Sequence, residues 1–163
     1  MIFDPTGKEK RLMTDSSSIY RYIHAGKGEV TLVSPMSLKA HSYLFKQPAD
    51  SGSFPADTIF VYVIHEGHSM YIGMLDNQYG FRLTNKSAFG EHTEAVKGAR
   101  YIVKMASNQN LVDKRSMLLY HSGRCCKCGR LLRSDKALKL GIGRCCIKFY
   151  EELSQKEPWD GNK

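Results

Sequence analysis

All five cysteines of the chain lie within residues 120–150, and their spacing is typical of a metal site. Cys125 and Cys128 form a C-x-x-C pair followed by Gly129, which lets two thiolates converge on one ion in a tight turn. Sixteen residues separate Cys128 from the adjacent Cys145 and Cys146. An odd number of clustered thiols argues against a disulfide framework and for reduced cysteines that hold a metal.

Zinc prefers a closed tetrahedral set of sulfur and nitrogen ligands. The candidate ligands are His121, Cys125, Cys128 and Cys146, with Cys145 as the alternative to His121. Adjacent side chains diverge, so binding of one ion by both Cys145 and Cys146 would be strained. We interpret Cys126 as a spare thiol. A C-x-x-C turn followed by a helix that begins near the second cysteine pair predicts a treble-clef-like module with structural Zn²⁺.

Positive charge gathers in the same segment. Residues 114–148 contain ten Lys or Arg and one acidic residue, Asp135, whereas the whole chain has a formal net charge of +8. Such a cluster favours an anionic partner, with nucleic acid before membrane. The candidate phosphate-binding residues are Arg124, Lys127, Arg130, Arg133, Lys136, Lys139, Arg144 and Lys148.

The preceding residues predict an α+β domain. Alternating apolar residues predict strands over 29–34, 38–46, 57–65, 69–75 and 79–84, and the last three form an antiparallel meander. The stretch 16–24 is compatible with a short helix or an edge strand. Apolar residues at helical spacing predict one main helix over 91–106 that packs on the sheet. Residues 111–120 are expected to form a connector or a short strand.

The predicted boundaries are a flexible N-terminal arm over 1–18, a sheet-and-helix domain over 19–112, a basic zinc module over 113–153 and a frayed tail over 154–163. Aromatic residues on the strands would stack on bases if one sheet face were open, although core packing is the simpler interpretation. They are Phe60, Tyr62, Tyr71, Tyr79 and Phe81.

Five segments of the chain resemble a known family. YHSGRCCKCGRLL at 120–132 and LGIGRCC at 140–146 are similar to the C-terminal signature of small, mostly phage- and plasmid-borne proteins of unassigned function. EVTLVSPMS, MYIGML and FRLTNKSAFG resemble earlier segments of the same family. The resemblance implies an intracellular, mobile-element context and favours His121 over Cys145 as the fourth ligand. Arg144 replaces a family proline, and the loop 133–138 lacks another proline.

These observations exclude some functions and favour others. No apolar run reaches the roughly 18 residues of a membrane span, and no signal peptide is evident, so we expect a cytoplasmic protein. His65 and His68 flank a predicted turn and lack the i, i+4 spacing of a helical H-E-x-x-H metalloprotease site, which argues against an enzyme. We expect nucleic-acid binding without sequence specificity through the basic module. The alternative is a protein that binds and modulates a host factor, with purely structural zinc.

Overall fold

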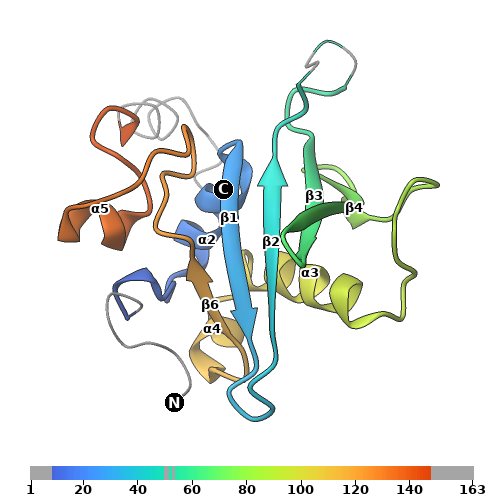
Figure 1. The fold of residues 1–163 in the computed structure, drawn as a ribbon, viewed down its shortest axis with the longest axis horizontal. Coiled ribbons are helices and arrows are strands. Elements are labelled where there is room, and N and C mark those ends of the chain that lie inside the picture. Colours follow the sequence, from blue (N-terminus) through green and yellow to red (C-terminus); the bar gives the residue numbers. More distant parts are fainter. Residues whose placement is uncertain (1–8, 50–51, 53, 148–163) are drawn as a thin grey trace.

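The computed structural model describes residues 9–49, 52 and 54–147 (Figure 1). Its centre is a six-stranded sheet in which all neighbouring strands are antiparallel. Along the sheet the strands are β5 (Gly80–Arg82), β4 (His68–Asp76), β3 (Ile59–His65), β2 (Ala40–Lys46), β1 (Lys27–Val33) and β6 (Leu118–His121). The helical elements are η1 (Glu9–Arg11), α2 (Ser16–His24), α3 (Glu94–Met105), α4 (Gln109–Lys114) and α5 (Asp135–Leu140). The predicted α+β class with an antiparallel sheet is confirmed.

Along each strand, successive side chains point to opposite faces of the sheet, so burial alternates with a period of two residues. In β3, Ile59, Val61 and Val63 are buried, whereas Phe60 and Tyr62 on the opposite face are half-buried. The predicted meander corresponds to β3, β4 and β5, and β3 is internal to the sheet, as its apolar character indicated. The turn between β3 and β4 is as tight as expected, because His65 pairs directly with His68.

The helices cover one face of the sheet. In α3, the Thr93 side chain accepts a hydrogen bond from the amide of Val96 and so caps the helix, which buries Ala99 and Ile102. Residues 16–24, which allowed two interpretations, form the helix α2, and its Asp15 cap accepts from the amide of Ser18. The structure therefore has several helices where the sequence predicted one main helix.

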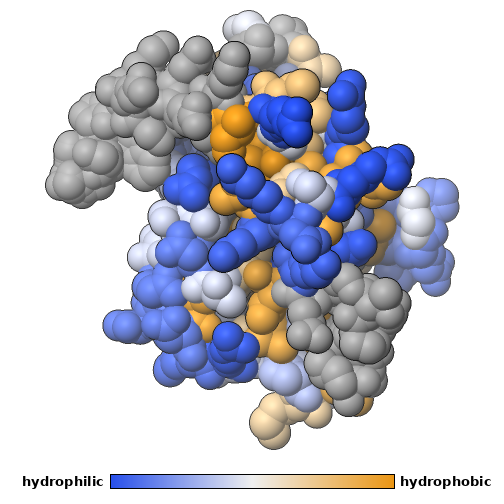
Figure 2. All heavy atoms as spheres, turned by 90° about the vertical axis from the view of Figure 1, so that its left-hand side faces the viewer, coloured by the Kyte–Doolittle hydropathy of each residue, from blue (hydrophilic) through white to orange (hydrophobic). Residues whose placement is uncertain are grey.

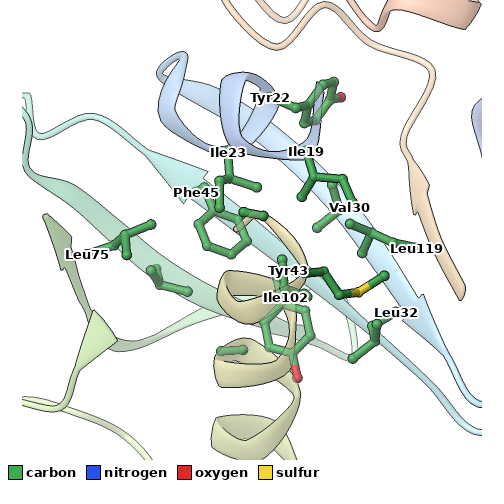
Figure 3. Close-up of a cluster of buried hydrophobic side chains, with 14 of the residues drawn as sticks. Ile19, Tyr22, Ile23, Val30, Leu32, Tyr43, Phe45, Leu75, Ile102 and Leu119 are labelled. Carbon is green, nitrogen blue, oxygen red and sulfur yellow. The ribbon is translucent and has the colours of Figure 1, made fainter. Parts of the chain in front are cut away.

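The hydrophobic core lies between these helices and the sheet. Ile19 and Ile23 of α2 and Ile102 of α3 point toward Phe45 and Tyr43 of β2 (Figure 3). All five side chains are almost fully buried. Burial of this apolar surface supplies the main favourable contribution to folding.

Two predicted boundaries differ from what is observed. The described part of the proposed flexible arm is held against the sheet, since Leu12 bridges Tyr120 and the amide of Met13 donates to the carbonyl of Leu119. The range proposed for the zinc module, 113–153, includes β6, which pairs with β1 and so belongs to the main sheet. The tail over 154–163 lies outside the described residues.

Candidate metal centre

Three cysteines come together beside the β6 end of the sheet. The Sγ atoms of Cys125, Cys128 and Cys146 all lie within 4.8 Å of one another. Zinc–sulfur bonds of about 2.3 Å at tetrahedral angles require sulfurs roughly 3.8 Å apart. The three thiols can therefore close on one metal ion with movements of less than about an ångström per pair.

Backbone hydrogen bonds build the turn that presents Cys125 and Cys128. The amide of Cys125 donates to the carbonyl of Arg130, and the amide of Gly129 donates to the carbonyl of Cys125. Gly129 has a φ of +80°, a conformation that glycine adopts without strain. A bridge between Arg124 and Leu131 closes the hairpin. This arrangement confirms that the C-x-x-C-G sequence folds as a tight turn that brings the two thiols close together.

The third cysteine reaches the turn through a second glycine-containing segment. The amide of Gly143 donates to Cys125 Sγ at 3.4 Å, and the carbonyl of Gly143 accepts from the amide of Cys146 at 3.0 Å. Gly143 therefore contacts both halves of the site. The helix predicted to follow lies largely outside the described residues.

The electrostatics of the thiols favour binding of a cation. Burial opposes ionisation of Cys125, but amides of Gly143, Cys128 and Lys127 donate to its sulfur and lower its pKa. Burial, together with hydrogen bonding and negative charge from the other two thiols, raises the pKa of Cys146 to about 12. Ionisation of one thiol thus makes ionisation of the next harder. A divalent ion would reverse that penalty, because it stabilises all three thiolates.

His121 does not join the three cysteines, which differs from the ligand set that the sequence favoured. Its Nδ1 accepts a hydrogen bond from the amide of Gly123 at 3.0 Å, so its Nε2 carries the proton and donates to the carbonyl of Leu138 at 2.6 Å. The buried ring also stacks on Tyr22, with centroids 5.4 Å apart. Both ring nitrogens are occupied within the protein, so His121 ties β6 to α5.

The two remaining cysteines differ from each other. Cys145 is exposed and lies outside the group of three. Cys126 is fully buried in the main hydrophobic core, so it packs as a core residue and is not a surface thiol. Its amide donates to the carbonyl of Gly141, and its carbonyl accepts from the amide of Lys27 at the start of β1.

The cation-rich surface is also present. Figure 2 shows the side of the molecule that carries α5, where hydrophilic side chains cover much of the described surface with apolar side chains between them. Lys127 is half-buried and Lys148 lies outside the described residues. The other predicted phosphate-binding residues are exposed: Arg124, Arg130, Arg133, Lys136, Lys139 and Arg144.

Sequence reasoning missed a further cation near this surface. Lys10 Nζ lies 2.7 Å from Asp135 Oδ1 and so neutralises the single acidic residue of the basic segment. The two residues are 125 positions apart in the chain. Only the packing of η1 against α5 brings them together, so no local pattern could have indicated the pair.

Comparisons of the chain with protein families, with curated proteins and with solved structures found no match. Among the described residues, none of the helices combines the length and apolar character needed to cross a membrane.

Proposed function

We propose that this chain holds a structural Zn²⁺ through Cys125, Cys128 and Cys146 and binds nucleic acid, without sequence specificity, through the basic surface around that ion. The observation that carries the proposal is the coincidence of the three-thiol group with six exposed Arg and Lys side chains. The only acidic residue of that segment is already paired with Lys10.

Zinc is the metal that best fits the donors. Soft thiolates select Zn²⁺ over Mg²⁺ or Ca²⁺, and structural zinc sites are commonly built on such turns. A C-x-x-C turn joined to a cysteine at the start of the next turn supports a treble-clef-like arrangement. Because both nitrogens of His121 are engaged, Cys145 becomes the stronger candidate for the fourth ligand within the described chain.

The charge of the site favours phosphate binding even when metal is bound. Three thiolates and one Zn²⁺ sum to one negative charge, or to two if Cys145 is the fourth ligand, so the six exposed cations around the site still dominate. Exposed Arg and Lys side chains neutralise phosphates and release counterions, which gives salt-dependent affinity that does not discriminate between sequences. Such binding fits the mobile-element context that the sequence resemblance implies.

The test is a fluorescence anisotropy titration of zinc-loaded protein against single- and double-stranded DNA and RNA at about 50 and 200 mM salt. We expect affinity to fall by orders of magnitude between the two salt concentrations. The variant Arg130→Glu/Arg133→Glu should bind more weakly and with a shallower salt dependence. Lys97→Glu/Lys104→Glu on α3 makes the same charge change away from the site and should bind as the wild type does. Equal binding by both double variants would remove the basic surface from the function.

A second candidate function is binding to a host protein. Met36 is 91% exposed and Leu38 is 48% exposed in the turn between β1 and β2, and Leu131 and Leu140 are exposed among the basic residues. Exposed apolar side chains that form a contiguous patch are typical of protein interfaces. An apolar interface should tolerate added salt, whereas phosphate binding should not. A host protein that stays bound to the wild type at high salt, but not to the variant Met36→Ser/Leu38→Ser, would favour this alternative.

A further inference from the structure

Among the described residues, no helix packs on one face of the sheet, and this face presents aromatic side chains. The helices α2 and α3 pack on the face that buries Val61 and Val63. On the opposite face, Phe60 and Tyr62 of β3 and Tyr71 of β4 are half-buried. The pairing register places Tyr62 opposite Tyr71, so these rings are neighbours across the strands.

The aromatic rings form a continuous edge-to-face cluster. The ring centroid of Tyr71 lies 5.6 Å from that of Phe60 and 5.9 Å from that of Tyr62, with interplanar angles of 83° and 71°. Phe54 packs against Phe60 in the same manner, at 5.0 Å. In an edge-to-face pair the rings stand nearly perpendicular, so some ring faces of the cluster are not covered by another ring. Partly exposed rings of this kind provide stacking surfaces for planar ligands.

The same sheet face carries positive charge next to the cluster. Lys46 of β2 pairs with Phe60 on one side and with Lys27 of β1 on the other. Lys27, Lys46 and Arg124 line a pocket of about 220 Å³ together with Glu29, Leu44 and Gly129. No ion pair among the described residues involves any of the three cations. The pocket therefore has a net positive charge despite Glu29.

This pocket connects the aromatic cluster to the metal centre. Gly129 follows the metal-ligating Cys128, and Arg124 precedes Cys125 and donates to the carbonyl of Gly129 at 3.2 Å. On its other side, Leu44 is paired with Tyr62. Strands lie about 4.8 Å apart, so the rings of β3 are only about 10 Å from β1. The group of cations thus adjoins the group of aromatic rings on one sheet face.

We propose that the helix-free sheet face binds single-stranded nucleic acid, with a phosphate in the pocket between Lys27, Lys46 and Arg124 and bases stacked on Phe60, Tyr62 and Tyr71. This inference rests on the proposed function and adds the preferred strand state and the surface. A duplex cannot stack its bases on these rings, because its bases are already paired and stacked within the helix. Stacking tolerates any sequence, since every base has a π face.

The test compares single- and double-stranded DNA of the same sequence by anisotropy, using zinc-loaded protein. Tyr62→Leu and Phe60→Leu remove a ring but keep an apolar side chain on the strand. Each should weaken single-strand binding about five- to tenfold and leave duplex binding nearly unchanged. Tyr101→Leu changes another half-buried tyrosine, on α3, and serves as the matched control with no expected effect. Circular dichroism and zinc content should be the same in all variants.

A second measurement locates the contact directly. Photocrosslinking of 5-bromouracil-substituted single-stranded DNA, followed by mass spectrometry, should label Phe60, Tyr62 or Tyr71. Crosslinks confined to residues of the basic segment, or unchanged single-strand affinity in both ring variants, would overturn the sheet-face proposal while leaving the proposed function intact. If the wild type binds neither form at low salt, both proposals fail, and a protein partner becomes the explanation for the surface.

Discussion

Tyr22 of α2 donates a hydrogen bond from its Oη to the carbonyl oxygen of Arg124, at 2.9 Å. A residue of the helical layer is thus bound to the backbone of the cysteine turn, 102 positions away. Burial of Tyr22 raises the pKa of its hydroxyl, so the group stays protonated and remains a donor across the physiological pH range. The turn that carries the candidate ligands Cys125 and Cys128 is therefore held by the core of the domain.

The first prediction concerns this bond. Tyr22→Phe leaves the Arg124 carbonyl without its buried donor, so we expect the free energy of unfolding of the zinc-loaded protein to fall by roughly 1–2 kcal/mol. Urea denaturation measures this change. Tyr20→Phe is the matched control, because the Tyr20 hydroxyl bonds to Asn77 at the exposed surface and its loss should cost under about 0.5 kcal/mol. Equal effects of the two changes would show that the Tyr22 bond does not hold the turn.

The second prediction concerns metal removal. Cys128→Ser should lose zinc, because one of three converging thiolates is replaced by a poor ligand. Cys125 and Cys126 belong to the main hydrophobic core, so loss of metal should also lower the melting temperature of the sheet. Amide hydrogen exchange should accelerate at Lys27, whose N–H donates to the carbonyl of Cys126.

Calorimetry and zinc content by mass spectrometry check both parts. Cys126→Ala is the control, because it should lower stability through core packing while retaining one zinc per chain. Retention of stoichiometric zinc by Cys128→Ser would refute the ligand assignment. Unchanged exchange at Lys27 in the metal-free protein would show that residues 113–153 behave as an independent unit.

The third prediction decides the fourth ligand. Because both nitrogens of His121 are engaged, His121→Gln should retain one zinc per chain but lower stability, whereas Cys145→Ser should weaken zinc binding. Substitution with Co²⁺ provides a spectroscopic readout, since the intensity of the thiolate charge-transfer absorption grows with the number of sulfur ligands. Loss of metal from His121→Gln with full retention in Cys145→Ser would restore the histidine that the sequence resemblance favoured.

The fourth prediction concerns pH. Burial lowers the pKa of His24 to about 4, from an ordinary value of 6.5, against a smaller opposite effect from Asp57. The folded state thus binds fewer protons at this site than the unfolded state does. The resulting stability is present above pH 6.5 and is lost as pH falls toward 4.

Because the His24 side chain is only partly buried, we expect a loss of roughly 1–3 kcal/mol over that interval. Equilibrium unfolding between pH 7 and pH 4 in wild type and His24→Phe isolates the contribution, since other groups titrate in both proteins. Parallel pH profiles for the two proteins would contradict it.

Much of the sheet could be predicted from local patterns, because alternation in β3 and β4 and the turn at 66–67 are encoded within a few residues. The proximity of Cys125 and Cys128 was predictable for the same reason, because the C-x-x-C-G turn is encoded within a few residues. The engagement of His121 could not be predicted, since its partner Leu138 depends on where α5 packs. The approach of Lys27 to the cysteine turn was also hidden, because it depends on the pairing of β1 with β6.

The last prediction concerns Gly98, which lies within the continuous helix α3. Helix propensity alone says that Gly98→Ala should stabilise the protein by roughly 1 kcal/mol. In the structure, a Cβ at this position would lie 2.2 Å from the Oη of Tyr43. That oxygen cannot move freely, because it donates to the carbonyl of Ala95 at 2.7 Å. We therefore expect Gly98→Ala to lower the free energy of unfolding by about 1–2 kcal/mol.

A double-mutant cycle tests this cause. Tyr43→Phe removes the obstructing oxygen, so in that background Gly98→Ala should cost much less or become stabilising, with a coupling energy of about 1 kcal/mol or more between the two sites. Gly90→Ala is the control, because nothing lies within 4 Å of its added Cβ, and it should be neutral or slightly stabilising. Additive effects of the two changes would show that the close approach of α3 to β2 does not require a glycine.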